Sequence, residues 1–256
     1  MLRNQQASGH CERGQNMRNF FVVPMKALIS RLMLVIALGS AGAWAQPVNK
    51  NVAPGFAGIT ANDTVVLMPV DVELFSLSAG GVVEPKADWT GAALKHMTAA
   101  IAELKATWGV KFTLLTEQEA DDFADQVALH AAVAQSIALH HSIAGVWALP
   151  TKQGRLLWSF EDAMKPIAAR TGSRYALFVW MRDSYASAER KAAMVAFALL
   201  GVGITGGTQI GYASLVDLSD GRVVWYNRLQ RQSGDLRDAN SARQSVETLL
   251  TDLPVR

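Results

Sequence analysis

Hydrophobic and polar positions along this chain alternate between a spacing typical of strands and a spacing typical of helices. Five short apolar runs, rich in β-branched residues, predict strands at 64–70, 110–115, 175–182, 209–218 and 222–230. Residues 72–84 surround Gly80 and Gly81 and predict a hairpin. The last two runs are separated by Ser219, Asp220 and Gly221, a turn signal in which Gly221 would supply a positive φ.

Apolar residues spaced three and four apart predict helices between these runs, at 88–108, from Thr116 to about 145–150, at 159–170 and at 239–252. Asp88 is expected to cap the first of them, and Thr116 with Glu119 forms a capping box for the second. Pro166 is expected to kink or split the third helix, because it removes a backbone donor.

This alternation of strands and helices predicts an α/β fold. We expect a single three-layer sandwich, a mixed sheet of about five strands with a carboxy-proximal β-hairpin and covering helices. The domain is expected to span residues 64–256, after a flexible lead-in at 46–63 that holds two prolines and two glycines.

The first 45 residues have the layout of a secretory signal peptide. A basic stretch precedes the apolar run at 32–38, and small residues lead to Ala43-Trp44-Ala45. The run is shorter than the roughly 20 residues of a membrane-spanning helix. Because a signal of ordinary length would begin at Met25, the start of translation stays open between Met1, Met17 and Met25.

The signal pattern predicts cleavage between Ala45 and Gln46. Amino-terminal sequencing of the exported protein should therefore begin at Gln46. A mature species that retains residues 32–38 would contradict this assignment.

Charge and cysteine usage exclude several classes of function. The chain has 24 basic and 22 acidic residues, but five basic and one acidic residue lie in the first 45, so the remainder has a net charge of −2. Such a domain has no electrostatic footprint for nucleic acid. The single cysteine, Cys11, lies in the leader, so the mature chain offers no disulfide, no thiol chemistry and no lipoprotein acylation site.

No motif with catalytic, cofactor or metal chemistry has its required context. Residues 201–206 match G-x-G-x-x-G, but a helical pattern precedes them and a strand follows, the reverse of a dinucleotide site. The acidic residues at 117–125 lack calcium-loop spacing, and His130 and His141 lie too far apart on one helix to share a metal. We therefore expect no cofactor, no metal and no enzymatic activity.

An apolar insertion at 187–207 is the most unusual segment. No charged residue occurs from 192 to 216. Met194, Phe197, Leu199 and Leu200 are the candidate contact residues for a partner or a membrane, and a plain core helix is the alternative. We expect a helix with one face packed on the sheet and one face free.

Three segments resemble a bacterial envelope superfamily: residues 65–70 (VVLMPV), 173–179 (SRYALFV) and 214–225 (SLVDLSDGRVVW). That superfamily includes the curli secretion channel subunit, penicillin-binding protein activator lipoproteins and the amino-terminal domain of the Tol translocation protein. The resemblance covers about residues 64–252 and implies envelope assembly work through protein contacts, with no catalytic residues. Two features differ, since the anchor cysteine is missing and the insertion is helical where the curli subunit has amphipathic β-hairpins.

The first hypothesis is therefore a periplasmic, non-enzymatic protein that binds envelope proteins, with homo-oligomers as one form. One alternative is an outer-membrane-associated oligomeric secretion component that contacts lipid through residues 187–207. A second alternative is a cofactor-free secreted hydrolase in which serine, histidine and aspartate converge in a pocket.

Overall fold

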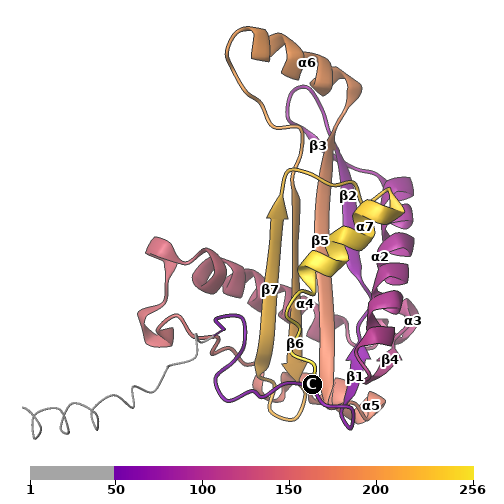
Figure 1. The fold of residues 1–256 in the computed structure, drawn as a ribbon, viewed down its shortest axis with the longest axis vertical. Helices are drawn as coiled ribbons and strands as arrows, with labels where there is room; N and C mark the ends of the chain where they lie inside the picture. The colour runs from indigo at the N-terminus through magenta and orange to yellow at the C-terminus, as the bar shows by residue number, and fades with distance from the viewer. Residues whose placement is uncertain (1–48) are drawn as a thin grey trace, which may run out of the picture. The chain divides into compact units, whose positions relative to one another are not determined.

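The computed structural model describes residues 49–256 (Figure 1). The predicted signal peptide, the cleavage site at Ala45 and Gln46, and the first residues of the lead-in lie outside them. The strands are β1 (Thr64–Leu67), β2 (Asp71–Leu77), β3 (Val83–Pro85), β4 (Lys111–Leu114), β5 (Tyr175–Ala186), β6 (Gln209–Asp217) and β7 (Val223–Arg231). The helices are α2 (Ala87–Thr107), α3 (Glu117–Asp121), α4 (Ala124–Ile137), α5 (Lys165–Thr171), α6 (Ala188–Leu199) and α7 (Ala239–Leu249), with shorter turns η1 (Ala138–Ile143), η2 (Gly145–Trp147), η3 (Pro150–Lys152) and η4 (Glu161–Met164).

The long strand β5 organises a mixed sheet. On one side it pairs parallel with β1 and then with β2, which follow one another along it, and on the other side it pairs antiparallel with β6. β4 adds to β1, β3 adds to β2, and β7 adds to β6. The strand predicted at 64–70 ends at Leu67, because Pro69 has no backbone N–H to donate to a neighbouring strand. The sheet has seven strands, against about five expected, because the β2–β3 hairpin joins it.

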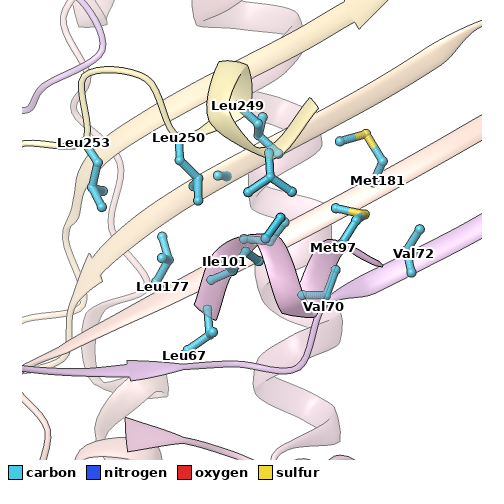
Figure 2. Packing of buried hydrophobic residues seen from close by; sticks show 14 of the residues in the cluster. Leu67, Val70, Val72, Met97, Ile101, Leu177, Met181, Leu249, Leu250 and Leu253 are labelled. Atoms are coloured by element: carbon cyan, nitrogen blue, oxygen red, sulfur yellow. The ribbon is translucent and has the colours of Figure 1, made fainter. Parts of the chain in front are cut away.

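Helices cover both faces of the sheet, so the three-layer α/β prediction is confirmed. Alternate strand residues point to opposite faces. Leu67 and Leu177 pack with α2 and α7 in one core (Figure 2), whereas Val66 and Ala176 pack with α4 and α5 in the other. Both faces of the sheet are thus occupied by the helices of the body.

Two predicted helices differ in detail from the structure. Lys86, not Asp88, is the residue before α2, and Asp88 lies inside its first turn. The helix predicted from Thr116 onward is interrupted at Phe123, whose side chain is buried, and its last turns are the π-helical η1. The Thr116–Glu119 capping box is present, with Glu119 N–H donating to Thr116 Oγ1 at 3.2 Å.

The remaining helices follow their sequence signals more closely. The stretch predicted at 159–170 is split into η4 and α5, with Pro166 in the first turn of α5, where the missing N–H costs nothing. α7 ends at Leu249, before the predicted end at residue 252. No helix within residues 49–256 is both long and apolar enough to cross a lipid bilayer.

The β6–β7 connection is tight at Gly221. Its φ is 71°, and its N–H donates to Asp217 O at 2.8 Å, one residue after Asp220. A Cβ added at Gly221 would lie 2.1 Å from the backbone oxygen of Glu161, which belongs to the neighbouring η4 segment. A glycine is therefore required here both by the backbone conformation and by the close approach of Glu161.

Candidate functional site

The insertion between β5 and β6 forms a projecting arm, defined here as residues 187–207. It holds α6 and the return segment that leads into β6, and it stands at the top of Figure 1, past the ends of the sheet strands. Five large apolar side chains on it are exposed: Val195 (65%), Phe197 (44%), Leu199 (84%), Leu200 (76%) and Val202 (49%). Exposed apolar side chains gathered on one element mark a contact surface.

The expectation that one face of this helix packs on the sheet is wrong. Only Arg190 is buried among the side chains of α6, and Met194 is half-buried. A Cβ built on Gly206 would lie 3.2 Å from Met194 Cε, so the methionine covers the return segment of the arm itself. The physical reason is that both faces of the sheet are already covered by other helices.

Arg190 fixes the arm to the body. Its Nε donates to Thr205 O at 2.9 Å on the return segment, and its guanidinium donates to Ser78 O at 3.1 Å in the β2–β3 connection. Ser187 caps α6 by accepting from Arg190 N–H at 3.2 Å. The sequence offers no signal for this role, since an arginine in a first helical turn is ordinarily a solvated side chain.

The base of the arm is closed by a tight backbone crossing. Thr208 N–H donates to Ser184 Oγ at 2.9 Å. Gly207 has a φ of 145°, and a Cβ there would lie 1.9 Å from Ser184 O. The glycine-rich run in the sequence therefore marks the place where the two ends of the arm meet.

Below the arm, a polar network surrounds a hollow of about 310 Å³. Burial raises the pKa of the Asp183 carboxyl, and the hydrogen bonds donated by Tyr185 Oη (2.5 Å) and Gln209 Nε2 (2.6 Å) act against that shift. Gln209 Oε1 in turn accepts from Arg231 Nε at 2.8 Å. The network joins β5, β6 and β7 directly beneath the arm, so it supports the position from which the arm projects.

Arg237 completes this support from the loop before α7. Its guanidinium lies 4.4 Å from the ring centre of Trp89 and 4.1 Å from that of Tyr185, and it pairs with Asp235 at 2.6 Å. Arginine held between two aromatic rings and a carboxylate is a rigid arrangement. It ties the ends of α2 and β5 together.

A serine and a histidine do meet in the structure, where the second core adjoins a hollow of only about 20 Å³ that His130 lines. His130 Nε2 contacts Ser214 Oγ, and the imidazole stacks on Phe178 with ring centres 3.9 Å apart. Both residues are buried, and within residues 49–256 no carboxylate hydrogen-bonds this histidine. Burial lowers the pKa of His130 to about 3, so the imidazole stays neutral and is a weak base. This geometry favours a structural role over that of a hydrolase dyad.

The other chemical candidates are separated in the structure. His140 Nδ1 bonds Trp147 O and His141 Nε2 bonds Lys50 O, each at 2.7 Å. In the described part of the chain, no three metal-ligating side chains come together. Residues 201–206 lie in the return segment between α6 and β6, so a strand follows them and not a helix amino terminus.

Comparison with known proteins gives no family assignment. No family model and no curated protein sequence matches this chain. Among solved structures, the PelC dodecamer from Paraburkholderia phytofirmans is 14% identical over 78% of this chain and 92% of that chain, with a TM-score of 0.36. The LpoB C-terminal domain from Escherichia coli is 13% identical over 70% and 89%, with a TM-score of 0.29. Lipoprotein GNA1162 from Neisseria meningitidis is 12% identical over 67% and 81%, with a TM-score of 0.26. At these values no family, role or residue assignment carries over to this chain.

Proposed function

We propose that this chain is a non-enzymatic protein of the bacterial cell envelope that works through contacts with other envelope components, proteins above all, in assembly or maintenance. The arm is its contact element. One observation carries the proposal: the large apolar side chains of α6 are exposed on an element that the body does not use for its own core. Exposing them has a solvation cost, which a contact would recover.

Further support comes from the sequence and from the buried polar groups. The signal-peptide pattern before Gln46 and the family resemblance both favour export to the periplasm. The serine–histidine contact found within residues 49–256 is buried, with Ser214 0% and His130 4% exposed, and the hollow that His130 lines holds only about 20 Å³. Contact, rather than catalysis, is therefore the function that the geometry favours.

Single aspartate substitutions on the arm test this proposal. We expect Phe197→Asp, Leu199→Asp and Leu200→Asp to keep a cooperative thermal transition, because each position is exposed. The same variants should lose association with the envelope fraction after export, because a carboxylate in a contact surface must be desolvated. Thermal denaturation and co-sedimentation with envelopes measure the two effects.

Two control variants define the limits of the experiment. Leu177→Asp places a carboxylate in the core and should fail to fold. Val146→Asp changes a side chain that is 93% exposed outside the arm, and it should fold and associate normally. Unfolding by all three arm variants, or undiminished association by all three, would contradict the proposed function.

A further inference from the structure

The apolar residues of the arm surround the helix instead of forming one stripe. At 100° per residue, Val195, Leu199, Leu200 and Phe197 point in directions about 0°, 40°, 140° and 200° around the axis. The residues between them are alanines, and no charged side chain occurs from 192 to 216. A helix that docks in a protein groove presents apolar residues on one face and polar residues on the other. This helix has no polar face over its second half.

A second apolar tip lies beside the arm, on the β2–β3 hairpin. Val82 (61%) and Val83 (53%) are exposed there, next to Gly80 and Gly81. The Arg190 hydrogen bond to Ser78 O connects this hairpin to the arm, so both tips belong to the same end of the molecule (Figure 1). The charged neighbours on the hairpin, Glu84 and Lys86, pair with each other at 3.2 Å.

We propose that this end of the molecule, the arm together with the β2–β3 tip, is a peripheral membrane anchor that inserts into the interfacial zone of a lipid bilayer. The inference rests on the proposed function and names what the arm itself contacts, which leaves the rest of the surface to protein partners. α6 has 12 residues, so it is about 18 Å long, too short to span a bilayer. It is long enough to reach the 5–10 Å depth at which interfacial helices lie.

The composition of the arm and of the β2–β3 tip also predicts which lipid headgroups the anchor requires. No charged residue occurs from 192 to 207, and the exposed charges of the arm, Glu189 and Lys191, are opposite in sign. Attraction to anionic headgroups therefore contributes little, and burial of apolar side chains supplies the affinity. Binding should therefore occur on neutral phosphatidylcholine vesicles and should change little between low salt and 0.5 M salt. A dependence on anionic lipid that salt abolishes would overturn the proposed mode of attachment.

Flotation of the exported, processed protein with phosphatidylcholine vesicles tests the anchor. We expect the wild-type protein to float, and Leu199→Ser combined with Leu200→Ser to lower the partition coefficient at least about tenfold. The matched control is Ile143→Ser combined with Val146→Ser, which removes two comparably apolar and exposed side chains outside the arm. Equal flotation of the two double variants would overturn the anchor.

Fluorescent labels then report which residues enter the lipid. The only cysteine, Cys11, lies in the leader, so Leu200→Cys, Val82→Cys and Val146→Cys can each be labelled singly in the processed protein. An environment-sensitive dye should shift to shorter wavelength with vesicles at the first two positions and stay unchanged at Val146. A shift at Leu200 without one at Val82 would remove the hairpin from the anchor.

Photo-crosslinking from the same Leu200→Cys position separates the two proposals. If the wild-type protein does not float but crosslinks to an envelope protein, and the Leu199→Ser and Leu200→Ser changes prevent its association, the lipid anchor is overturned and the proposed function stands. If it neither floats nor crosslinks, and the arm substitutions leave envelope association unchanged, both proposals fail.

Discussion

Lowering the pH from 7 to 4 should destabilise this protein by about 3 kcal/mol through His130 alone, and His130→Gln should remove that contribution. Burial lowers the pKa of this imidazole from 6.5 to about 3, because its charged form cannot be solvated between Phe178 and Ser214. The native state therefore holds the imidazole neutral, whereas the unfolded state binds a proton once the pH falls below 6.5. Stability from this group is fully present above pH 6.5 and is lost as the pH falls toward 3, at roughly 1.4 kcal/mol per pH unit.

Urea unfolding at pH 7.5, 6, 5 and 4 measures the effect. The free energy of unfolding of the wild-type protein should fall more steeply with acidity than that of His130→Gln, whose neutral amide can still hydrogen-bond Ser214. Gln135→Ala, at an exposed position of the same helix, is the control and should follow the wild-type slope, because neither side chain binds a proton in this pH range. Parallel slopes for the wild-type protein and His130→Gln would show that His130 is not held neutral.

Gly221→Val should lower the free energy of unfolding by about 3 kcal/mol or more. A φ of 71° costs a side chain on the order of 1 kcal/mol, and β-branching makes this worse. The new Cβ would also lie 2.1 Å from Glu161 O and 2.5 Å from Glu161 N. Because both are backbone atoms, no rotamer change relieves the overlap, and η4 or the β6–β7 turn must move.

A second glycine isolates the contribution of that contact. Gly109 has a φ of 64°, but a Cβ built there meets nothing within 4 Å. Gly109→Val should therefore show only the conformational cost, and the difference between the two variants in urea denaturation measures the contact with Glu161. Similar denaturation midpoints would mean that the turn is free to shift away from η4.

The parts of the fold that the sequence predicts are those with local signals. Alternating apolar runs gave the strands, the Gly80-Gly81 and Asp220-Gly221 pairs gave the two hairpins, and Thr116 with Glu119 gave a helix start that the structure contains. The end of β1 after Leu67 was not predicted, because the apolar run continues past Pro69 to Val70. Pro69 was itself a signal for the end of the strand, since proline has no backbone N–H to donate.

The candidate site depends on contacts between distant parts of the chain. An apolar helix such as α6 has the same composition whether it is buried or exposed, and its environment depends on which helices already cover the sheet. Arg190 bonds Ser78, 112 residues earlier, and His130 contacts Ser214, 84 residues later. The glycine pattern likewise predicts the positive φ of Gly221 but not the approach of Glu161.

The arm joins two strands that are already paired side by side, with Asp183 opposite Gln209 at the last rung of their ladder. Two antiparallel strands need only a short turn between them, and lengthening such a connection adds little entropic cost. Within the arm, residues 187–207, the sheet therefore sets few requirements on the amino acids: the Arg190 hydrogen bond to Ser78 O and the crossing of Gly207 over Ser184. Selection can change the length and composition of this segment to suit a new binding surface while the rest of the polypeptide keeps its architecture.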